Sequence, residues 1–174
     1  MTAPNPAPTP AGPSKPVTPG PAAPASAGRT TLPAESLRAL SAALECENAA
    51  VWSYGLVAAH DPADAALLTT IVAGHLARRD ATASLLRAAG SNPPGPAPAY
   101  SVPVPVKDAA GARALATVLE NDCAAAWNAV VGTTDLSDLR GIALAGLSDS
   151  AVWLTDLKLT GKITPPTVPF PGRA

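Results

Sequence analysis

Proline is distributed unevenly along this 174-residue chain, and its positions decide where regular helices can form. Nine of the 21 prolines fall in residues 1–28, six in residues 91–107 and four in residues 163–174. Because proline lacks a backbone N–H and clashes with the preceding turn, none of these segments can be a regular helix. The other two prolines, Pro33 and Pro62, suit the first turn of a helix, where that N–H is not needed.

The proline-poor stretches carry apolar residues at spacings of three and four, the period of an amphipathic helix. We predict helices over Pro33–Ala59, Asp61–Gly90, Asp108–Val131 and Asp135–Gly161, with Asp61 as an N-cap and Gly90 as the residue after a helix end. No stretch alternates as a strand does. Short links make two antiparallel hairpins, and the proline-rich link can cross the length of a bundle. The sequence therefore predicts an all-α, ferritin-like four-helix bundle with one long crossover between the second and third helices.

The bundle is expected to occupy residues 31–162, between two segments of different character. Residues 1–30 are rich in Pro and Ala, bury too little apolar surface to offset chain entropy, and are predicted to be disordered. Residues 163–174 should form an extended tail along the surface. A net charge of −1 argues against a nucleic-acid partner, and no apolar run is long enough to span a membrane. We expect a cytoplasmic protein, because no export signal is visible; a start site placed further upstream could hide one.

Polar residues at core positions are the most informative, and each predicted helix has one: Glu47, His75, Glu120 and Asp149. A buried carboxylate costs several kcal/mol unless it is paired, protonated or metal-bound. One solution is a di-metal centre built from glutamates and Glu-x-x-His pairs. The other is an internal ion network in which His75, Arg78 or Arg79 supplies the positive charge.

The spacing of these residues favours the ion network. Glu-x-x-His pairs would need Glu at position 72 and His at position 152, and the chain has Val72 and Val152. The favoured interpretation is a structural polar network that includes Arg78, Arg79 and Asp149, with no cofactor. A single iron, manganese or zinc ion on Glu47, His75 and Glu120 remains the alternative.

The two cysteines and three tryptophans have less specific interpretations. Cys46 adjoins Glu47 and Cys123 is one turn from Glu120, so the thiols could lie close enough for a disulfide. In a reducing compartment, two buried packing thiols are favoured instead. Tryptophans on three different helices are expected to fill the core: Trp52, Trp127 and Trp153.

Several stretches resemble an actinobacterial ferritin-like family that is itself a domain of unknown function. They are residues 47–55 (ENAAVWSYG), 75–80 (HLARRD), 98–106 (PAYSVPVPV), Leu119-Glu120 and 167–172 (TVPFPG). The resemblance covers residues 31–172 and implies a ferritin-like bundle without an established activity. In metal-binding relatives, the positions of Glu47, His75 and Glu120 would be metal ligands.

Three functions follow as hypotheses. The favoured one is a non-catalytic structural or interaction module with a degenerate metal site, paired as a homodimer or recruiting a protein partner through its N-terminal tail. The second is a metal-dependent oxidoreductase of the ferritin-like superfamily. The third is a ligand carrier with a cavity beside small residues of the fourth helix: Ala143, Gly146 and Ser150.

Overall fold

The computed structural model describes residues 31–173, which form four α-helices and no β-strand. The helices are α1 (Ala34–His60), α2 (Ala65–Ala88), α3 (Ala109–Gly132) and α4 (Ser137–Thr160), with a short 3-10 helix, η1 (Pro62–Asp64), between α1 and α2. The prediction of an all-α bundle of four helices is confirmed. The predicted disorder of residues 1–30 lies outside the described residues.

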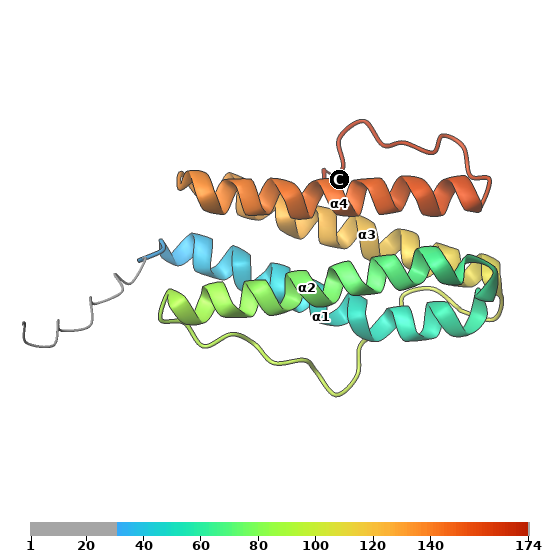
Figure 1. Cartoon of the computed structure of the whole chain (residues 1–174), viewed down its shortest axis with the longest axis horizontal. Helices are drawn as coiled ribbons and strands as arrows, with labels where there is room; N and C mark the ends of the chain where they lie inside the picture. The colour runs from blue at the N-terminus through green and yellow to red at the C-terminus, as the bar shows by residue number, and fades with distance from the viewer. Residues whose placement is uncertain (1–30, 174) are drawn as a thin grey trace, which may run out of the picture.

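The connections set the direction of each helix (Figure 1). α1 and α2 form one antiparallel hairpin, and α3 and α4 form the other. The link from 89 to 108 has no helix and runs along the bundle from the end of α2 to the start of α3. α2 and α3 therefore point in the same direction, as a crossover requires.

Helix ends follow the sequence signals in two places. The Asp108 carboxylate accepts a hydrogen bond of 2.8 Å from the Gly111 amide and so caps α3. Gly90 follows the end of α2 with φ of +78°, a left-handed conformation that glycine adopts without strain. Pro33 occupies the N-cap of α1 rather than its first turn.

The predicted N-cap role of Asp61 is wrong. η1 intervenes before α2, and Asp61 makes no side-chain cap there. Its carboxylate instead accepts a hydrogen bond from Arg113 of α3, at 3.0 Å, and Asp61 is only 1% exposed. Asp61 therefore forms a tertiary ion pair instead of a local cap. The spacing of residues within one helix does not predict such a pair, because its partner lies on another helix.

Two apolar clusters form the core. One contains Tyr54, Ile71 and Leu115, and the other contains Leu40, Leu86 and Trp127, with other residues in each. Each large side chain buried this way stabilises the fold by about 1.5–3 kcal/mol. α1 packs against α2 and α3, and α3 packs against α4.

The backbones of α2 and α4 do not approach each other closely, and side chains fill the space between them. The Trp153 ring of α4 lies directly against Gly74 of α2. On α4 itself, Gly146 leaves room for the Trp127 ring of α3, because an added Cβ would lie 2.6 Å from that ring. Because Gly74 and Gly146 have no side chain, the indole rings of Trp153 and Trp127 can pack between the helices.

Trp52 does not fill the core as predicted. It is 42% exposed, and its ring packs against Tyr100 of the long link at 5.8 Å between centroids. The segment after α4 turns back along the bundle (Figure 1), where Asn128 of α3 donates to the Gly172 carbonyl. No single described helix is long and apolar enough to cross a membrane; only the pair Ala34–His60 and Pro62–Ala88, bent by 109°, meets that test jointly.

A buried ion network as the candidate functional site

Three of the predicted site residues meet at the middle of the bundle. His75 of α2 lies between Glu47 of α1 and Glu120 of α3, and all three are 0% exposed. Its Nδ1 is 2.7 Å from Glu47 Oε2, and its Nε2 is 2.9 Å from Glu120 Oε1. Both ring nitrogens therefore contact a carboxylate. An imidazole donates a hydrogen bond to both carboxylates only when both of its nitrogens carry a proton.

Two aromatic side chains complete the carboxylate contacts. The Trp127 indole donates to Glu47 Oε1 at 2.7 Å, and the Tyr54 hydroxyl donates to Glu120 Oε1 at 2.6 Å. Tyr54 is seven residues after Glu47 on α1, and Trp127 is seven after Glu120 on α3, so each pair shares a helix face. The sequence placed both aromatic residues on the apolar stripes, but gave no sign that they would donate to buried acids.

Arg78 brings a second positive charge to the network. Its Nε lies 3.1 Å from Glu47 Oε1 without hydrogen-bond alignment, so this contact is an ion pair. Its Nη1 donates to the Gly146 carbonyl at 2.8 Å. Its Nη2 lies 3.0 Å from His75 Nδ1 and donates to Ser150 Oγ at 3.3 Å. The guanidinium carbon is 4.5 Å from the centre of the Trp153 ring. Arg78 thus connects α1, α2 and α4.

The other two residues expected in the network lie at its edge or outside it. Asp149 is 55% exposed and its Oδ2 is 3.9 Å from Arg78 Nη1, so the structure places it on the surface rather than in the core. Arg79 pairs with its neighbour Asp80, which is 70% exposed. Neither pair is expected to stabilise the fold by more than about 1 kcal/mol.

The protonation of His75 reflects competing effects. Burial by itself would lower the pKa of His75, but the hydrogen bonds to Glu120 and Glu47 outweigh it, and the pKa is raised above its ordinary value of 6.5. Burial and the neighbouring Glu120 raise the pKa of Tyr54 well above its ordinary value, so its hydroxyl remains a donor. Arg78 lies against Glu47, and His75 adds a second positive charge between Glu47 and Glu120 when it is protonated.

Some of these groups could also hold a metal. Ligand atoms of Glu47, His75 and Cys123 lie within 4.8 Å of one another, and all three residues are buried. Glu120 Oε2 is buried and has no hydrogen-bond partner among the described residues. α4 adds no carboxylate or imidazole, since Asp149 and Val152 both face outward. The donors are thus sufficient for one ion and lack the fourth helix's share of a di-metal set.

Cys46 and Cys123 lie beside this network. Cys46, on α1, is partly exposed, whereas Cys123, on α3, is buried, and both are free thiols here. The neighbouring Cys123 lowers the pKa of the Cys46 thiol, and burial opposes that shift. The neighbouring Cys46, together with burial, raises the pKa of Cys123 well above its ordinary value.

A second ion cluster, which the sequence patterns did not reveal, ties one end of the bundle together. Arg113 Nε of α3 lies 2.9 Å from Asp61 Oδ2 and 3.1 Å from Asp64 Oδ2. Burial raises the pKa of Asp61, and the adjacent Arg113 opposes that shift. This cluster fixes the α1–α2 turn against the first turns of α3.

In the part of the chain that the structure describes, the Trp127 ring and the Arg78 side chain occupy the space beside Gly146 and Ser150, where a cavity next to Ala143, Gly146 and Ser150 was expected. An open cleft of about 360 Å³ lies elsewhere, between the end of α2 and the start of α4. Apolar residues dominate its lining: Leu32, Leu85, Leu136, Leu139 and Ile142. The ligand-carrier hypothesis therefore loses its predicted site.

Comparison with known proteins places the chain in a family. Residues 39–174 match a family described as "Domain of unknown function (DUF4439)". The chain belongs to this family. A crystal structure of "a conserved hypothetical protein, rv2844, from Mycobacterium tuberculosis" is similar to it, with a TM-score of 0.71 and 36% sequence identity. The match covers 72% of this chain and 96% of that one. No curated protein matches.

The DUF4439 match begins inside α1 and includes every residue of the ion network, because Glu47 is the first of them along the chain. The names of the family and of the mycobacterial protein give no activity.

Proposed function

We propose that this DUF4439 domain is a non-catalytic structural and interaction module, in which a network of buried charges fixes how the four helices meet. The observation that carries the proposal is His75, whose two ring nitrogens each contact a glutamate, at 2.7 and 2.9 Å. A metal-ligating histidine needs one unprotonated nitrogen aimed at the ion. Here each nitrogen contacts a carboxylate, and Nδ1 also lies 3.0 Å from Arg78 Nη2.

Charge balance supports the same conclusion. Two buried glutamates require about two positive charges, and His75 and Arg78 supply them from within the protein. Arg78 lies against Glu47 and is held by the Gly146 carbonyl of α4, so a cation at Glu47 would meet a fixed guanidinium. The network therefore needs no additional ion to be stable.

Metal analysis tests this part of the proposal. The full chain, Glu47→Ala and Glu45→Ala are purified without chelator and measured by plasma mass spectrometry; Glu45 is the exposed neighbour on the same helix. We expect metal far below one ion per chain in all three, with a loss of stability confined to Glu47→Ala. Iron, manganese or zinc near one per chain that disappears only in Glu47→Ala would overturn the proposal.

A metal-binding oxidoreductase of the ferritin-like superfamily is the second candidate. It is favoured by the donor cluster of Glu47, His75 and Cys123, and by the unpartnered Oε2 of Glu120. To bind an ion there, His75 would have to lose a proton and exchange one carboxylate contact for the metal. Stoichiometric metal in the same experiment would select this candidate and make a redox assay the next step.

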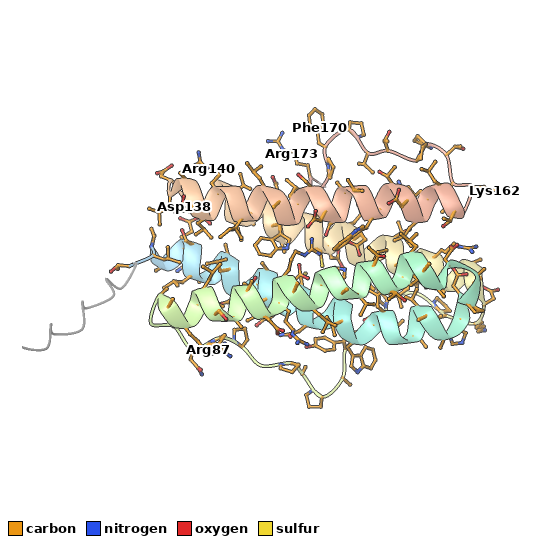
Figure 2. The ribbon with its side chains drawn as sticks, viewed as in Figure 1. Arg87, Asp138, Arg140, Lys162, Phe170 and Arg173 are labelled. Atoms are coloured by element: carbon orange, nitrogen blue, oxygen red, sulfur yellow. The ribbon has the colours of Figure 1, made fainter. Side chains whose placement is uncertain are left out.

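The interaction role rests on the outer face of α4, and we propose a second copy of the chain as its partner. This face, defined as Gly141, Ala145, Ser148, Val152 and Leu159, is exposed and has no charged member. Asp149 and Asp156 lie beside it, and Thr167 and Val168 of the C-terminal segment adjoin Val152. Asp138 lies near one end of α4 and Lys162 just beyond the other (Figure 2). If two α4 helices pair antiparallel, each Asp138 meets the partner's end that bears Lys162, while the uncharged faces pack. Recruitment of a partner by residues 1–30 remains a proposal about a segment outside the described residues.

A further inference from the structure

We infer that a cleft between α1, α2 and the start of the long link binds an extended acidic peptide of a partner protein. The cleft has a volume of about 370 Å³ and is lined by residues of both helices and by residues 93–96 of the link. That volume is within the range of ligand sites in proteins. None of the described residues that line it belongs to the ion network around His75 or to the outer face of α4, so the inference is independent of both.

Positive charge is in excess along the α2 wall of this cleft. Arg79 and Arg87 supply two guanidinium groups against a single carboxylate, that of Asp80. Arg87 is exposed and lies at the end of α2 beside the link (Figure 2), and it forms no ion pair within the described part of the chain. The cleft therefore favours an anionic ligand over a neutral or cationic one.

The contact between Arg79 and Asp80 shows that a carboxylate fits this wall. Arg79 Nε donates to Asp80 Oδ1 at 2.9 Å, and Arg79 Nη2 lies 2.8 Å from the same oxygen. Asp80 is 70% exposed, and an ion pair so open to water is weak. A ligand carboxylate can therefore replace Asp80 at the Arg79 guanidinium, whose planar fork suits two parallel hydrogen bonds to a carboxylate.

Asn48 of α1 provides an independent observation, a buried polar side chain without a partner. It is 4% exposed and lines the cleft, yet no described residue forms a hydrogen bond with its side chain. A buried amide without hydrogen bonds is costly. The Asn48 amide carries both a donor and an acceptor, as a peptide unit does, so the backbone of a bound peptide can satisfy it.

The length of the cleft favours a peptide over a small anion. Arg79 and Arg87 are eight residues apart, which corresponds to about 12 Å along α2. An extended peptide covers this distance in about four residues and can present a carboxylate to each arginine. The opposite wall, residues 93–96 (PPGP), is rigid and mostly apolar, because proline has a fixed φ and no backbone N–H.

The peptide is assigned to a partner because both ends of this chain have the wrong charge. Residues 1–30 contain Lys15 and Arg29 but no Asp or Glu. Residues 163–174 also contain no acidic residue. Neither segment can supply the carboxylates that the two arginines would bind.

An NMR titration of the isotope-labelled full chain tests the inference. The probes are a capped tetraglutamate peptide and a capped tetraglutamine peptide, which have the same length and differ in charge. We expect only tetraglutamate to shift the signals of the Asn48 side-chain amide and of the backbone around Arg79 and Arg87. These shifts should saturate and should weaken as salt is added.

Three results of this titration would overturn the inference. The first is the absence of shifts at millimolar tetraglutamate, and the second is equal shifts with tetraglutamine. The third is the same set of shifts, at the same concentration, with inorganic phosphate, which would indicate a site for a small anion instead.

Variants with opposite expected effects separate this site from general attraction between charges. Arg79→Gln and Arg87→Gln should each weaken tetraglutamate binding, whereas Asp80→Asn should strengthen it by about two- to fivefold, because it frees Arg79. Arg38→Gln makes the same change of net charge at an exposed residue of α1 outside the cleft and should leave the affinity nearly unchanged. An equal loss of affinity in Arg38→Gln, or weaker binding by Asp80→Asn, would also contradict the inference.

Discussion

His75 is the residue on which most of the interior depends. It contacts Glu47 and Glu120 by hydrogen bonds, and its ring packs beside those of Tyr54 and Trp153 at 5.4 and 5.1 Å between centroids. A single imidazole ring thus links α1, α2 and α3 and packs against α4. Its protonation should be visible in the stability of the whole domain.

The first prediction concerns pH. Because the folded pKa of His75 is raised above 6.5, the folded protein binds more protons than the unfolded chain once the pH exceeds that value. The stabilising contribution is complete below about pH 6.5 and is lost as the pH rises through the folded pKa. Urea unfolding between pH 6 and 8 should show a falling free energy of unfolding.

The matched variants for this prediction use the two histidines of the chain. His75→Gln should remove most of the decline, whereas His60→Gln should preserve it, since His60 lies at a helix end and hydrogen-bonds to the Leu56 carbonyl rather than to a carboxylate. A free energy of unfolding that rises over this range in the wild type would contradict a raised pKa. So would an equal decline in His75→Gln.

A second prediction concerns the buried carboxylate of Glu47. Glu47→Ala leaves Arg78, His75 and the Trp127 indole N–H without their common acceptor, and removing one partner from a buried ion pair costs about 3–5 kcal/mol. Urea titration followed by tryptophan fluorescence would measure the loss. Glu45→Ala, on the exposed face of the same helix, should leave the midpoint nearly unchanged. Equal midpoints for the two variants would show that the network contributes little.

At the scale of an element, α4 shows how two glycines in one helix can differ. Gly146 lies against the Trp127 ring, where an added Cβ would be 2.6 Å from the nearest atom, whereas Gly141 has nothing within 4 Å. We predict that Gly146→Ala destabilises the domain by roughly 1–3 kcal/mol through overpacking. Gly141→Ala should stabilise it by up to about 1 kcal/mol through helix propensity. Thermal melts of both variants check the opposite signs; a shift in the same direction would refute the packing argument.

The long link between α2 and α3 is an element whose sequence and structure agree for a simple reason. Its prolines exclude a helix, and an extended chain covers the length of the bundle with few residues. Where it reaches α3, Gly111 contacts its backbone: an added Cβ would lie 2.6 Å from the Pro105 carbonyl oxygen. The crossover is therefore packed against the bundle at its end and not merely tethered to it.

At the scale of the whole molecule, the outer face of α4 leads to a fourth prediction, which concerns the oligomeric state. Val152 lies in the middle of that face and is 56% exposed. Val152→Lys would place a charge at the centre of an antiparallel α4 pair, next to its own symmetry mate, and should convert a dimer into a monomer. Light scattering after size exclusion measures the mass. Thr69→Lys, on the exposed side of α2, serves as a control that should remain dimeric.

The dimer prediction is independent of the ion network. A monomeric wild-type protein at high micromolar concentration would remove the α4 interface without affecting the His75 and Glu47 predictions. Restoring the dimer is the complementary test: Asp138→Lys should weaken it through repulsion from the partner's Lys162, and adding Lys162→Asp should recover it.

The sequence by itself determined the helices and their order. Proline positions excluded helix where the links lie, and apolar spacing predicted four helices whose observed ends differ by a few residues. The same spacing placed Glu47, His75 and Glu120 on core stripes, because the face of a residue on a helix depends only on its position in that helix.

Tertiary structure decided what these residues contact. Whether Asp149 shares the core with Arg78 or points outward depends on the rotation of α4, and Asp149 proved exposed. The donors Tyr54 and Trp127, and the Arg113 pairs with Asp61 and Asp64, each join different elements. Such contacts depend on the angle and rotation at which helices pack. Local spacing does not encode these quantities, since many arrangements bury the same stripes.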